Sequence, residues 1–251
     1  MSATVGMRGR VRAVGVGAAI AVAGFLVGLV LSAAGLAVRA VFDIDLSLTA
    51  GFVLGVVLLQ GIAFPVTAFG YLRLRGLSFS FVKARLPSLR DGLWIVSGYV
   101  LVFVLVIGSL FVAVSLDAPT ASRADQGALQ DPGTLIWLIP LSLLVIGPGE
   151  ELLFRGVIQS RLRESFGPVG AIVLAGTMFA PAHILALTGS LQALAVTIAI
   201  LFVPALVFGV VYELTDNLVV PAVVHGAYNA TIFGMLYIRL LYGPTQPPGL
   251  L

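Results

Sequence analysis

Few ionisable side chains lie within the apolar runs of this 251-residue chain, and two of them are adjacent carboxylates. Glu150 and Glu151 follow an apolar run that ends in Gly-Pro-Gly at 147–149, where we expect the helix to break. Glu151 and Arg155 are four residues apart, so they share a helix face and can form an ion pair. Glu150 points about 100° away and lacks that partner. It is therefore suited to accept and return a proton as a general base.

The two histidines of the chain both lie in apolar runs, and the run around His183 is otherwise uncharged. His183 ends the segment Phe179-Ala-Pro-Ala-His183, in which Pro181 is expected to kink or end a helix. His225 and Asn229 are four residues apart and share a helix face. Alternatively, both histidines are structural residues, because a lone histidine on an apolar face is more often packed in the core than catalytic. The paired glutamates likewise match an interfacial helix end.

The elements that must position these residues are transmembrane helices. Hydrophobic residues make up 59% of the chain, charged residues only 10%, and the mean hydropathy is +1.11. Soluble domains contain roughly a quarter charged residues, so this composition indicates a polytopic membrane protein. The expected spans are 13–38, 48–72, 93–116, 135–147, 169–187, 191–211 and 218–241.

The last span contains Pro221 and is predicted as one kinked helix or two shorter segments, so we expect seven or eight helices. The predicted fold is an all-α transmembrane bundle that forms a single membrane-embedded domain over residues 1–251. We expect a multi-pass protein of the cell membrane, in contact with the lipid bilayer.

Loop charges predict the orientation of the bundle, because basic residues are retained on the cytoplasmic side. The basic stretches contain Arg73, Arg75, Lys83, Arg85 and Arg90, and then Arg155, Arg161 and Arg163. The opposite loops contain Asp43 and Asp45, and then Asp117, Asp125 and Asp131. We therefore expect the amino terminus in the cytoplasm.

Several other chemistries have no support in the sequence. The chain has no cysteine, which excludes disulfides, thiolate metal sites and a cysteine nucleophile. Its net charge of +3 comes without a basic patch interleaved with aromatic residues, so no nucleic-acid partner is expected. An aspartyl intramembrane protease would need Gly-x-Gly-Asp, whereas residues 147–150 end in glutamate. A serine type would need a Gly-x-Ser-Gly turn, which the sequence does not contain.

Three short motifs occur in order on successive apolar segments. They are Glu150-Glu151-x-x-x-Arg155, Phe179-x-x-x-His183 and His225-x-x-x-Asn229. This arrangement resembles the CPBP family, which includes the CAAX prenyl endopeptidases of the Rce1 type and prokaryotic relatives called Abi or bacteriocin-processing proteins. The resemblance covers about residues 135–241, which we expect to form the protease core.

The resemblance implies an intramembrane endopeptidase that hydrolyses a peptide bond of a membrane-anchored peptide or protein, with a prenylated CAAX-type terminus as one candidate. Glu150 would activate a water molecule, and His183 would help to position it. His225 and Asn229 would stabilise the oxyanion, a role suited to imidazole and amide donors. The supporting residues would be Glu151, Arg155 and Phe179.

The need for a metal stays open at this point. If the enzyme is a metalloendopeptidase, as members of the family are often labelled, zinc would be held by Glu150, His183 and His225. The sequence contains no His-Glu-x-x-His helix, and Asn229 suits an oxyanion donor better than a zinc ligand. We therefore favour catalysis by glutamate without a cofactor.

The depths in the membrane expected for Glu150 and His183 do not agree. His183 lies about 21 Å along its helix, whereas Glu150 is expected near the inner edge of the membrane. A common site needs the helix of Glu150 to continue inward, or the next helix to tilt or start late.

Two other functions remain: a proton- or ion-coupled transporter with a polar path near broken helices, and a non-catalytic membrane scaffold or immunity protein.

Overall fold

The computed structural model describes residues 6–123, 129 and 131–243. Within these residues, seven helices are long and apolar enough to span a membrane. The first four are α1 (Met7–Val41), the continuous helix of α2 (Leu48–Val56), η1 (Val57–Ala63) and α3 (Phe64–Leu74), then α4 (Leu89–Ser115), and the helix Pro132–Arg163. The last three are α9 (Pro168–Ala182), which continues into the 3₁₀ turn η5 (His183–Ala186), α10 (Leu191–Thr215) and α11 (Val219–Tyr242). The predicted all-α transmembrane bundle is thus confirmed.

The helix Pro132–Arg163 alternates between α-helical and π-helical turns. Its parts are α6 (Pro132–Leu141), η3 (Ser142–Ile146), α7 (Gly147–Glu151), η4 (Leu152–Gln159) and α8 (Ser160–Arg163). The predicted break at 147–149 is therefore wrong. The π-helical turn η3 ends two residues before Pro148, where an α-helix would lose a backbone hydrogen bond, and the chain passes the proline without ending the helix.

The shorter elements lie in the connections between the spans. They are the 3₁₀ turn η2 (Phe79–Val82) and a two-residue antiparallel strand pair, β1 (Ser122–Arg123) with β2 (Leu187–Thr188). Helix α4 begins with a capping box: the Ser88 hydroxyl accepts a hydrogen bond from the backbone N–H of Asp91, and the Asp91 carboxylate accepts one from the backbone N–H of Ser88. The last predicted span, 218–241, is expected to form one or two helices, and it forms the single helix α11. The described residues therefore contain seven helices long and apolar enough to span a membrane.

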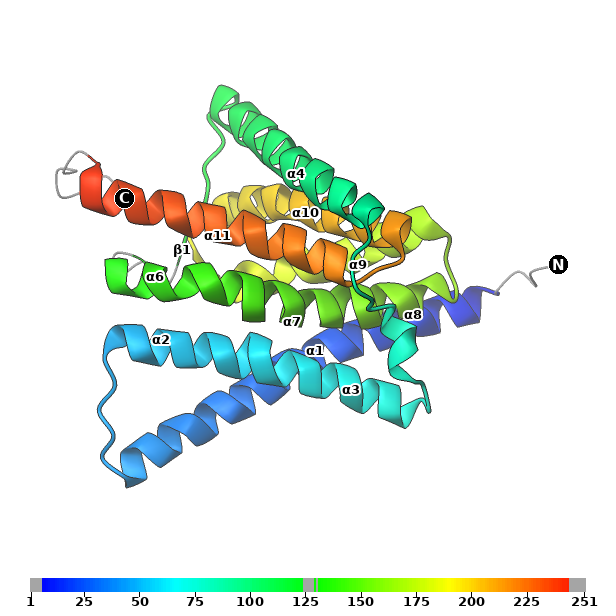
Figure 1. The fold of residues 1–251 in the computed structure, drawn as a ribbon, viewed down its shortest axis with the longest axis horizontal. Coiled ribbons are helices and arrows are strands. Elements are labelled where there is room, and N and C mark those ends of the chain that lie inside the picture. Colours follow the sequence, from blue (N-terminus) through cyan, green and yellow to red (C-terminus); the bar gives the residue numbers. More distant parts are fainter. Residues whose placement is uncertain (1–5, 124–128, 130, 244–251) are drawn as a thin grey trace.

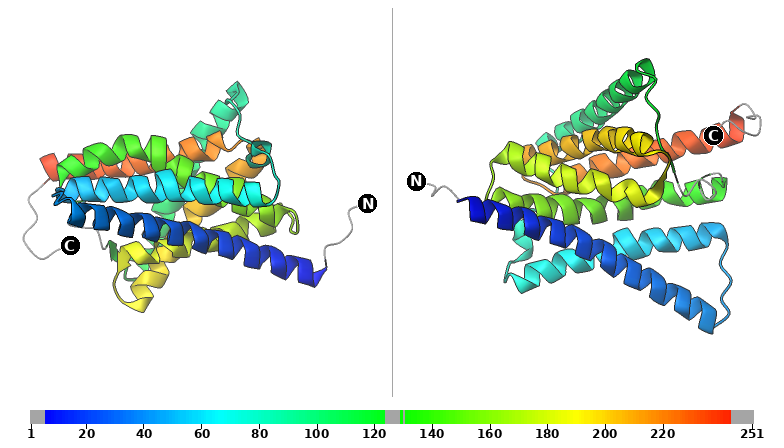
Figure 2. Two further views of the ribbon diagram at one scale, coloured as in Figure 1. Left: turned by 90° about the horizontal axis from the view of Figure 1, so that it is seen from below. Right: turned by 180° about the vertical axis from the view of Figure 1, so that it is seen from behind.

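The helix that contains α7 lies in the middle of the bundle. Figure 1 shows it between the α2–α3 helix and α11, with α1 crossing obliquely and α4 tilted at the outer edge. The view from behind shows α9 and α10 covering its other face (Figure 2). The central helix is therefore enclosed by neighbours on several sides, which places its polar residues inside the protein.

The two ends of the bundle differ in charge. The start of α1 and the α3–α4, α8–α9 and α10–α11 connections lie at one end (Figures 1 and 2). The basic residues of the predicted cytoplasmic stretches gather there, apart from Arg155, which is buried. The acidic residues Asp43, Asp45, Asp117 and Asp131 lie at the opposite end, whereas Asp125 lies outside the described residues. This distribution matches the predicted alternation of loop charge, and a cytoplasmic amino terminus stays a prediction.

Glycines allow three helices of the bundle to touch through their backbones. A Cβ atom at Gly149 would lie 1.9 Å from the carbonyl oxygen of Gln60 in η1. On the other side of α7, a Cβ atom at Gly147 would lie 2.6 Å from the carbonyl oxygen of Ala222 in α11. No side chain fits at these distances, so α7 is held against both η1 and α11 by close backbone contact.

We expect Gly149→Ala to destabilise the folded protein by roughly 3 kcal/mol or more, because its methyl group meets backbone atoms that cannot move aside. Thermal unfolding in detergent, followed by size-exclusion chromatography, measures the effect. Gly51→Ala is the matched control, since a Cβ atom at Gly51 meets nothing within 4 Å. If both variants unfold at the wild-type temperature, the backbones of α7 and η1 are not in close contact at Gly149.

Candidate functional site

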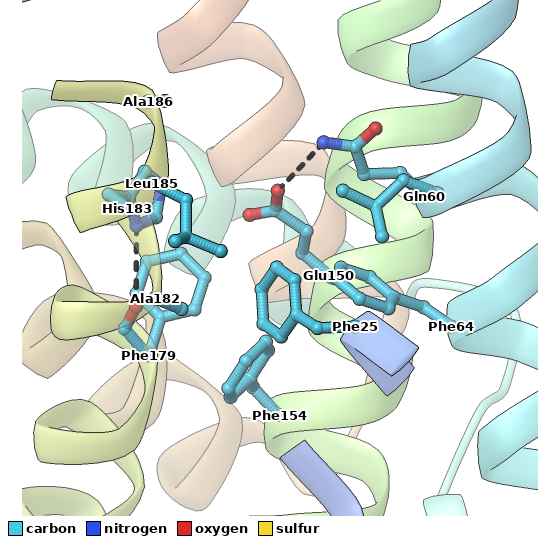
Figure 3. A pocket seen from close by; sticks show the side chains of 11 residues that line it. Phe25, Gln60, Phe64, Glu150, Phe154, Phe179, Ala182, His183, Leu185 and Ala186 are labelled. Carbon is cyan, nitrogen blue, oxygen red and sulfur yellow. Dashed lines mark hydrogen bonds between the residues drawn. The ribbon is translucent and has the colours of Figure 1, made fainter. Parts of the chain in front are cut away.

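Glu150 lies near the middle of the central helix and presents one carboxylate oxygen without a partner. Its Oε1 atom accepts a hydrogen bond of 3.3 Å from the Nε2 atom of Gln60. Its Oε2 atom is buried and has no hydrogen-bond partner among the described residues. Figure 3 shows this second oxygen turned away from Gln60 toward the side of a cavity on which His183 lies. The carboxylate thus accepts a hydrogen bond at one oxygen and none at the other, which lies 3.8 Å from the Nε2 atom of His225.

The cavity beside Glu150 has a volume of about 230 Å³ and lies between four helices of the bundle. Its walls come from α1, η1 and α3, the α7–η4 region, and the end of α9 with η5. Most of its lining is apolar or aromatic, including Phe25, Phe64 and Phe154 (Figure 3). The polar side chains in it are Gln60, Glu150 and His183. A peptide with apolar side chains could therefore enter next to a carboxylate and an imidazole.

His183 lies where α9 ends, on the wall opposite Glu150 (Figure 3). The predicted effect of Pro181 is confirmed, since α9 stops at Ala182 and the chain continues as a 3₁₀ turn. The Nδ1 atom of His183 is 3.3 Å from the carbonyl oxygen of Phe179. A carbonyl can only accept, so Nδ1 carries the proton of the neutral ring and Nε2 keeps a lone pair. The partly exposed ring can thus accept a hydrogen bond from water in the cavity.

His225 is buried between the two glutamates and links them. Its Nδ1 atom is 2.9 Å from Oε1 of Glu151, and its Nε2 atom is 3.8 Å from Oε2 of Glu150. The imidazole stacks on the ring of Phe208 with centroids 4.6 Å apart, and the edge of Phe179 packs against it at 5.9 Å. Carboxylate oxygens accept hydrogen bonds, so Glu151 fixes the proton on Nδ1 and directs Nε2 toward Glu150.

The predicted ion pair between Glu151 and Arg155 is present and fully buried. The Arg155 Nε atom is 3.2 Å from Oε2 of Glu151, and Nη2 donates a hydrogen bond of 3.0 Å to the carbonyl oxygen of Ala205. The guanidinium also lies over the rings of Phe179 at 4.7 Å and Phe208 at 5.7 Å. Arg155 therefore connects the acidic pair on the central helix to α9 and α10.

Asn229 is the predicted site residue that the structure does not bring to Glu150. It lies on α11 one turn after His225 and is partly buried. In the part of the chain that the structure describes, it forms no side-chain hydrogen bond, and it does not line the cavity. The expected shared helix with His225 is present, but Asn229, predicted as an oxyanion donor, does not line the cavity beside Glu150.

The depths of Glu150 and His183 agree because the central helix continues past the predicted break. Glu150 follows Pro132 by 18 residues and precedes Arg163 by 13, which puts it roughly 20 Å from the Arg163 end. His183 follows Pro168 by 15 residues, or roughly 22 Å from the same end of the bundle. Of the two explanations considered, continuation of the Glu150 helix is the one that the structure shows.

The residues present do not fit the alternative zinc site. Within the described residues, no group of three or more histidine, aspartate or glutamate side chains is arranged to hold a metal ion. The ring of Phe179 packs against both imidazoles, with centroids 5.0 Å from His183 and 5.9 Å from His225. The site therefore offers Glu150, His183 and His225 as separate polar groups rather than as one ligand set.

The sequence analysis missed Gln60 and Phe208, which contact Glu150 and His225, as well as the aromatic residues Phe25, Phe64 and Phe154 that line the cavity. Gln60 could have been found, because it is the only residue with a polar side chain between Ala50 and Val66. Phe208 carries no such signal, since one phenylalanine among the many apolar residues of α10 gives no hint that a histidine stacks on it.

Comparison with known proteins gives one match. Residues 132–231 match the family model described as type II CAAX prenyl endopeptidase Rce1-like. All three motifs lie within the matched segment. Comparison with curated proteins and with solved structures gives no significant match.

Proposed function

From the match of residues 132–231 to the Rce1-like family model, described as type II CAAX prenyl endopeptidase, we propose that Glu150 is the general base of an intramembrane peptidase. At the level of the family, the chain is a multi-pass membrane protein with a CAAX-type endopeptidase domain. The observation that carries the proposal is the Glu150 carboxylate, held by Gln60 at one oxygen and unpartnered at the other, on the wall of an apolar cavity.

In the proposed reaction, water binds between the free oxygen of Glu150 and the Nε2 atom of His183. Glu150 removes a proton as the water oxygen forms a bond to the scissile carbonyl carbon. The carbon–nitrogen bond then breaks, and the proton held by Glu150 passes to the leaving amine. His183 can orient the water because its Nδ1 proton is directed to the backbone, which leaves Nε2 as an acceptor.

His225 and Asn229 are proposed to donate hydrogen bonds to the oxyanion. Support for His225 comes from its Nε2 atom, which lies 3.8 Å from the Glu150 carboxylate and hence next to the reacting water. Glu151 stabilises a protonated ring by accepting from Nδ1, so Nε2 can then donate. Asn229 is on the same helix face one turn further on, and its amide would have to turn toward the cavity when substrate binds.

The proposed substrate is a peptide bond in a membrane-anchored peptide or protein. Support comes from the lining of the cavity, which is mostly apolar and is built from four membrane-spanning helices. Such a cavity favours apolar side chains or a lipid group next to the scissile bond. A prenylated CAAX terminus is the first candidate, because the family is described by that substrate. We also propose that residues 135–241 form the protease core within a single membrane domain, with the amino terminus in the cytoplasm.

Purified wild-type protein in detergent is expected to cleave a fluorogenic farnesylated CAAX peptide faster than its non-prenylated counterpart. Cleavage is expected to continue at an unchanged rate with a zinc chelator, because the polar residues do not converge into a ligand set. Fluorescence increase, with product masses determined by mass spectrometry, measures both outcomes. Loss of activity in chelator that added zinc restores would contradict catalysis by glutamate alone, and absence of cleavage of either peptide would contradict the proposed substrate.

A further inference from the structure

We infer that Gln60 is a positioning residue for Glu150, supplied by a helix outside the segment that matches the family model. The inference rests on the proposed function, since it gives Gln60 a task in the reaction proposed for Glu150. The matched segment begins at residue 132, whereas Gln60 lies in the second membrane-spanning helix. The first half of the chain therefore completes the site as well as covering it.

The amide side chain of Gln60 needs a hydrogen-bond partner in its apolar surroundings. It is the only polar side chain between Ala50 and Val66, in a helix that is otherwise apolar over this stretch. Burying a primary amide away from water is costly unless its hydrogen-bonding groups are paired. The partner present is Glu150, to which the Nε2 atom donates. The carboxylate opposite therefore accounts for the amide donor of Gln60, whereas its Oε1 atom has no partner among the described residues.

Backbone geometry brings the two side chains together. Gln60 lies in η1, a π-helical turn of seven residues, and its carbonyl oxygen packs against Gly149. A Cβ atom at Gly149 would come within 1.9 Å of that oxygen, so the two backbones are in direct contact at the residue before Glu150. Isolated π-helical turns often occur at functional sites, because they change the direction of side chains relative to the regular helix.

The hydrogen bond selects which carboxylate oxygen can react. Gln60 holds Oε1 of Glu150 at 3.3 Å, and the other oxygen, Oε2, has no partner among the described residues and lies 3.8 Å from Nε2 of His225. An amide donor orients a carboxylate without adding a charge or a second titrating group. Gln60 thus fixes the rotation of the carboxylate so that Oε2 is turned away from Gln60, toward the side of the cavity on which His183 lies (Figure 3).

The kinetic test replaces Gln60 by methionine, which is unbranched and of similar size but cannot donate. We expect Gln60→Met to lower kcat on the farnesylated peptide about 10- to 100-fold, as loss of a hydrogen bond to a charged group does, with KM within about twofold. The unfolding temperature is expected to stay at the wild-type value. Thr67→Val is the matched control, because it removes a buried hydroxyl without a partner from the same helix, and it should leave kcat unchanged. Wild-type kcat in Gln60→Met would overturn the inference, as would a loss of kcat matched by Thr67→Val.

A spectroscopic test does not depend on activity. The chain has four glutamates, Glu150, Glu151, Glu164 and Glu213, so ¹³C-labelled glutamate gives few carboxylate bands in the infrared spectrum. The band that disappears in Glu150→Gln belongs to Glu150, and in Gln60→Met it is expected to shift because the carboxylate loses an N–H donor. An unshifted band overturns the inference. If wild-type protein cleaves no peptide and the band still shifts, the proposed function fails and the contact alone stands, so the two failures are distinguished.

Discussion

Glu150→Gln is expected to lower kcat/KM by about 10²- to 10⁴-fold, because the substituted amide cannot accept the proton of the attacking water. The fold should be retained. The change is isosteric, and Gln60 can pair with the new amide through its Oε1 atom, which is buried and has no partner among the described residues. Initial rates of cleavage of the farnesylated peptide and the unfolding temperature measure the two effects separately.

The matched control is Glu213→Gln, which makes the same substitution in a surface ion pair with the exposed Arg163 near the end of the bundle. Its activity and stability should equal those of the wild type. Glu150→Gln with wild-type turnover would show that another group activates the water, and the proposed mechanism would fail. Loss of activity together with unfolding would point to a structural role for Glu150.

Removing either member of the Glu151–Arg155 pair is expected to have the largest effect on stability. Both side chains are fully buried, so Arg155→Leu or Glu151→Leu leaves one charge without its main partner at a cost of about 3–5 kcal/mol. For a chain of this size, the unfolding temperature should fall by roughly 10 °C. Thermal unfolding of the purified variants in detergent measures the change.

The double variant Glu151→Leu with Arg155→Leu separates stability from activity. It should recover most of the lost stability, since no buried charge of the pair remains unpaired. Its activity should stay low, because the Nδ1 atom of His225 loses the carboxylate that directs the ring toward Glu150. A double variant as unstable as either single one would show that the ion pair is not the main interaction of these residues. Wild-type activity in the double variant would show that Glu151 does not position His225.

Hydropathy was sufficient to predict the membrane helices, because a bilayer leaves a spanning segment few structures other than a helix with internally paired backbone groups. Most boundaries lie within a few residues of those predicted. The exception is the fourth span, where Gly147–Gly149 suggested a break. A sequence shows that proline removes one backbone hydrogen bond, but it does not show that a π-helical turn before Pro148 accommodates that loss.

The sequence by itself determined the residues that share a helix face, since spacings of four fix those relations within one helix. The ion pair between Glu151 and Arg155 follows from such a spacing, and so does the placement of His225 and Asn229 on one helix. Only the tertiary structure decided the contacts between helices: Gln60 against Glu150, His225 between two carboxylates, and Asn229 away from the cavity. These contacts depend on how closely the helices approach, which Gly147 and Gly149 allow but do not specify, because many helix pairings would bury the same apolar surface equally well.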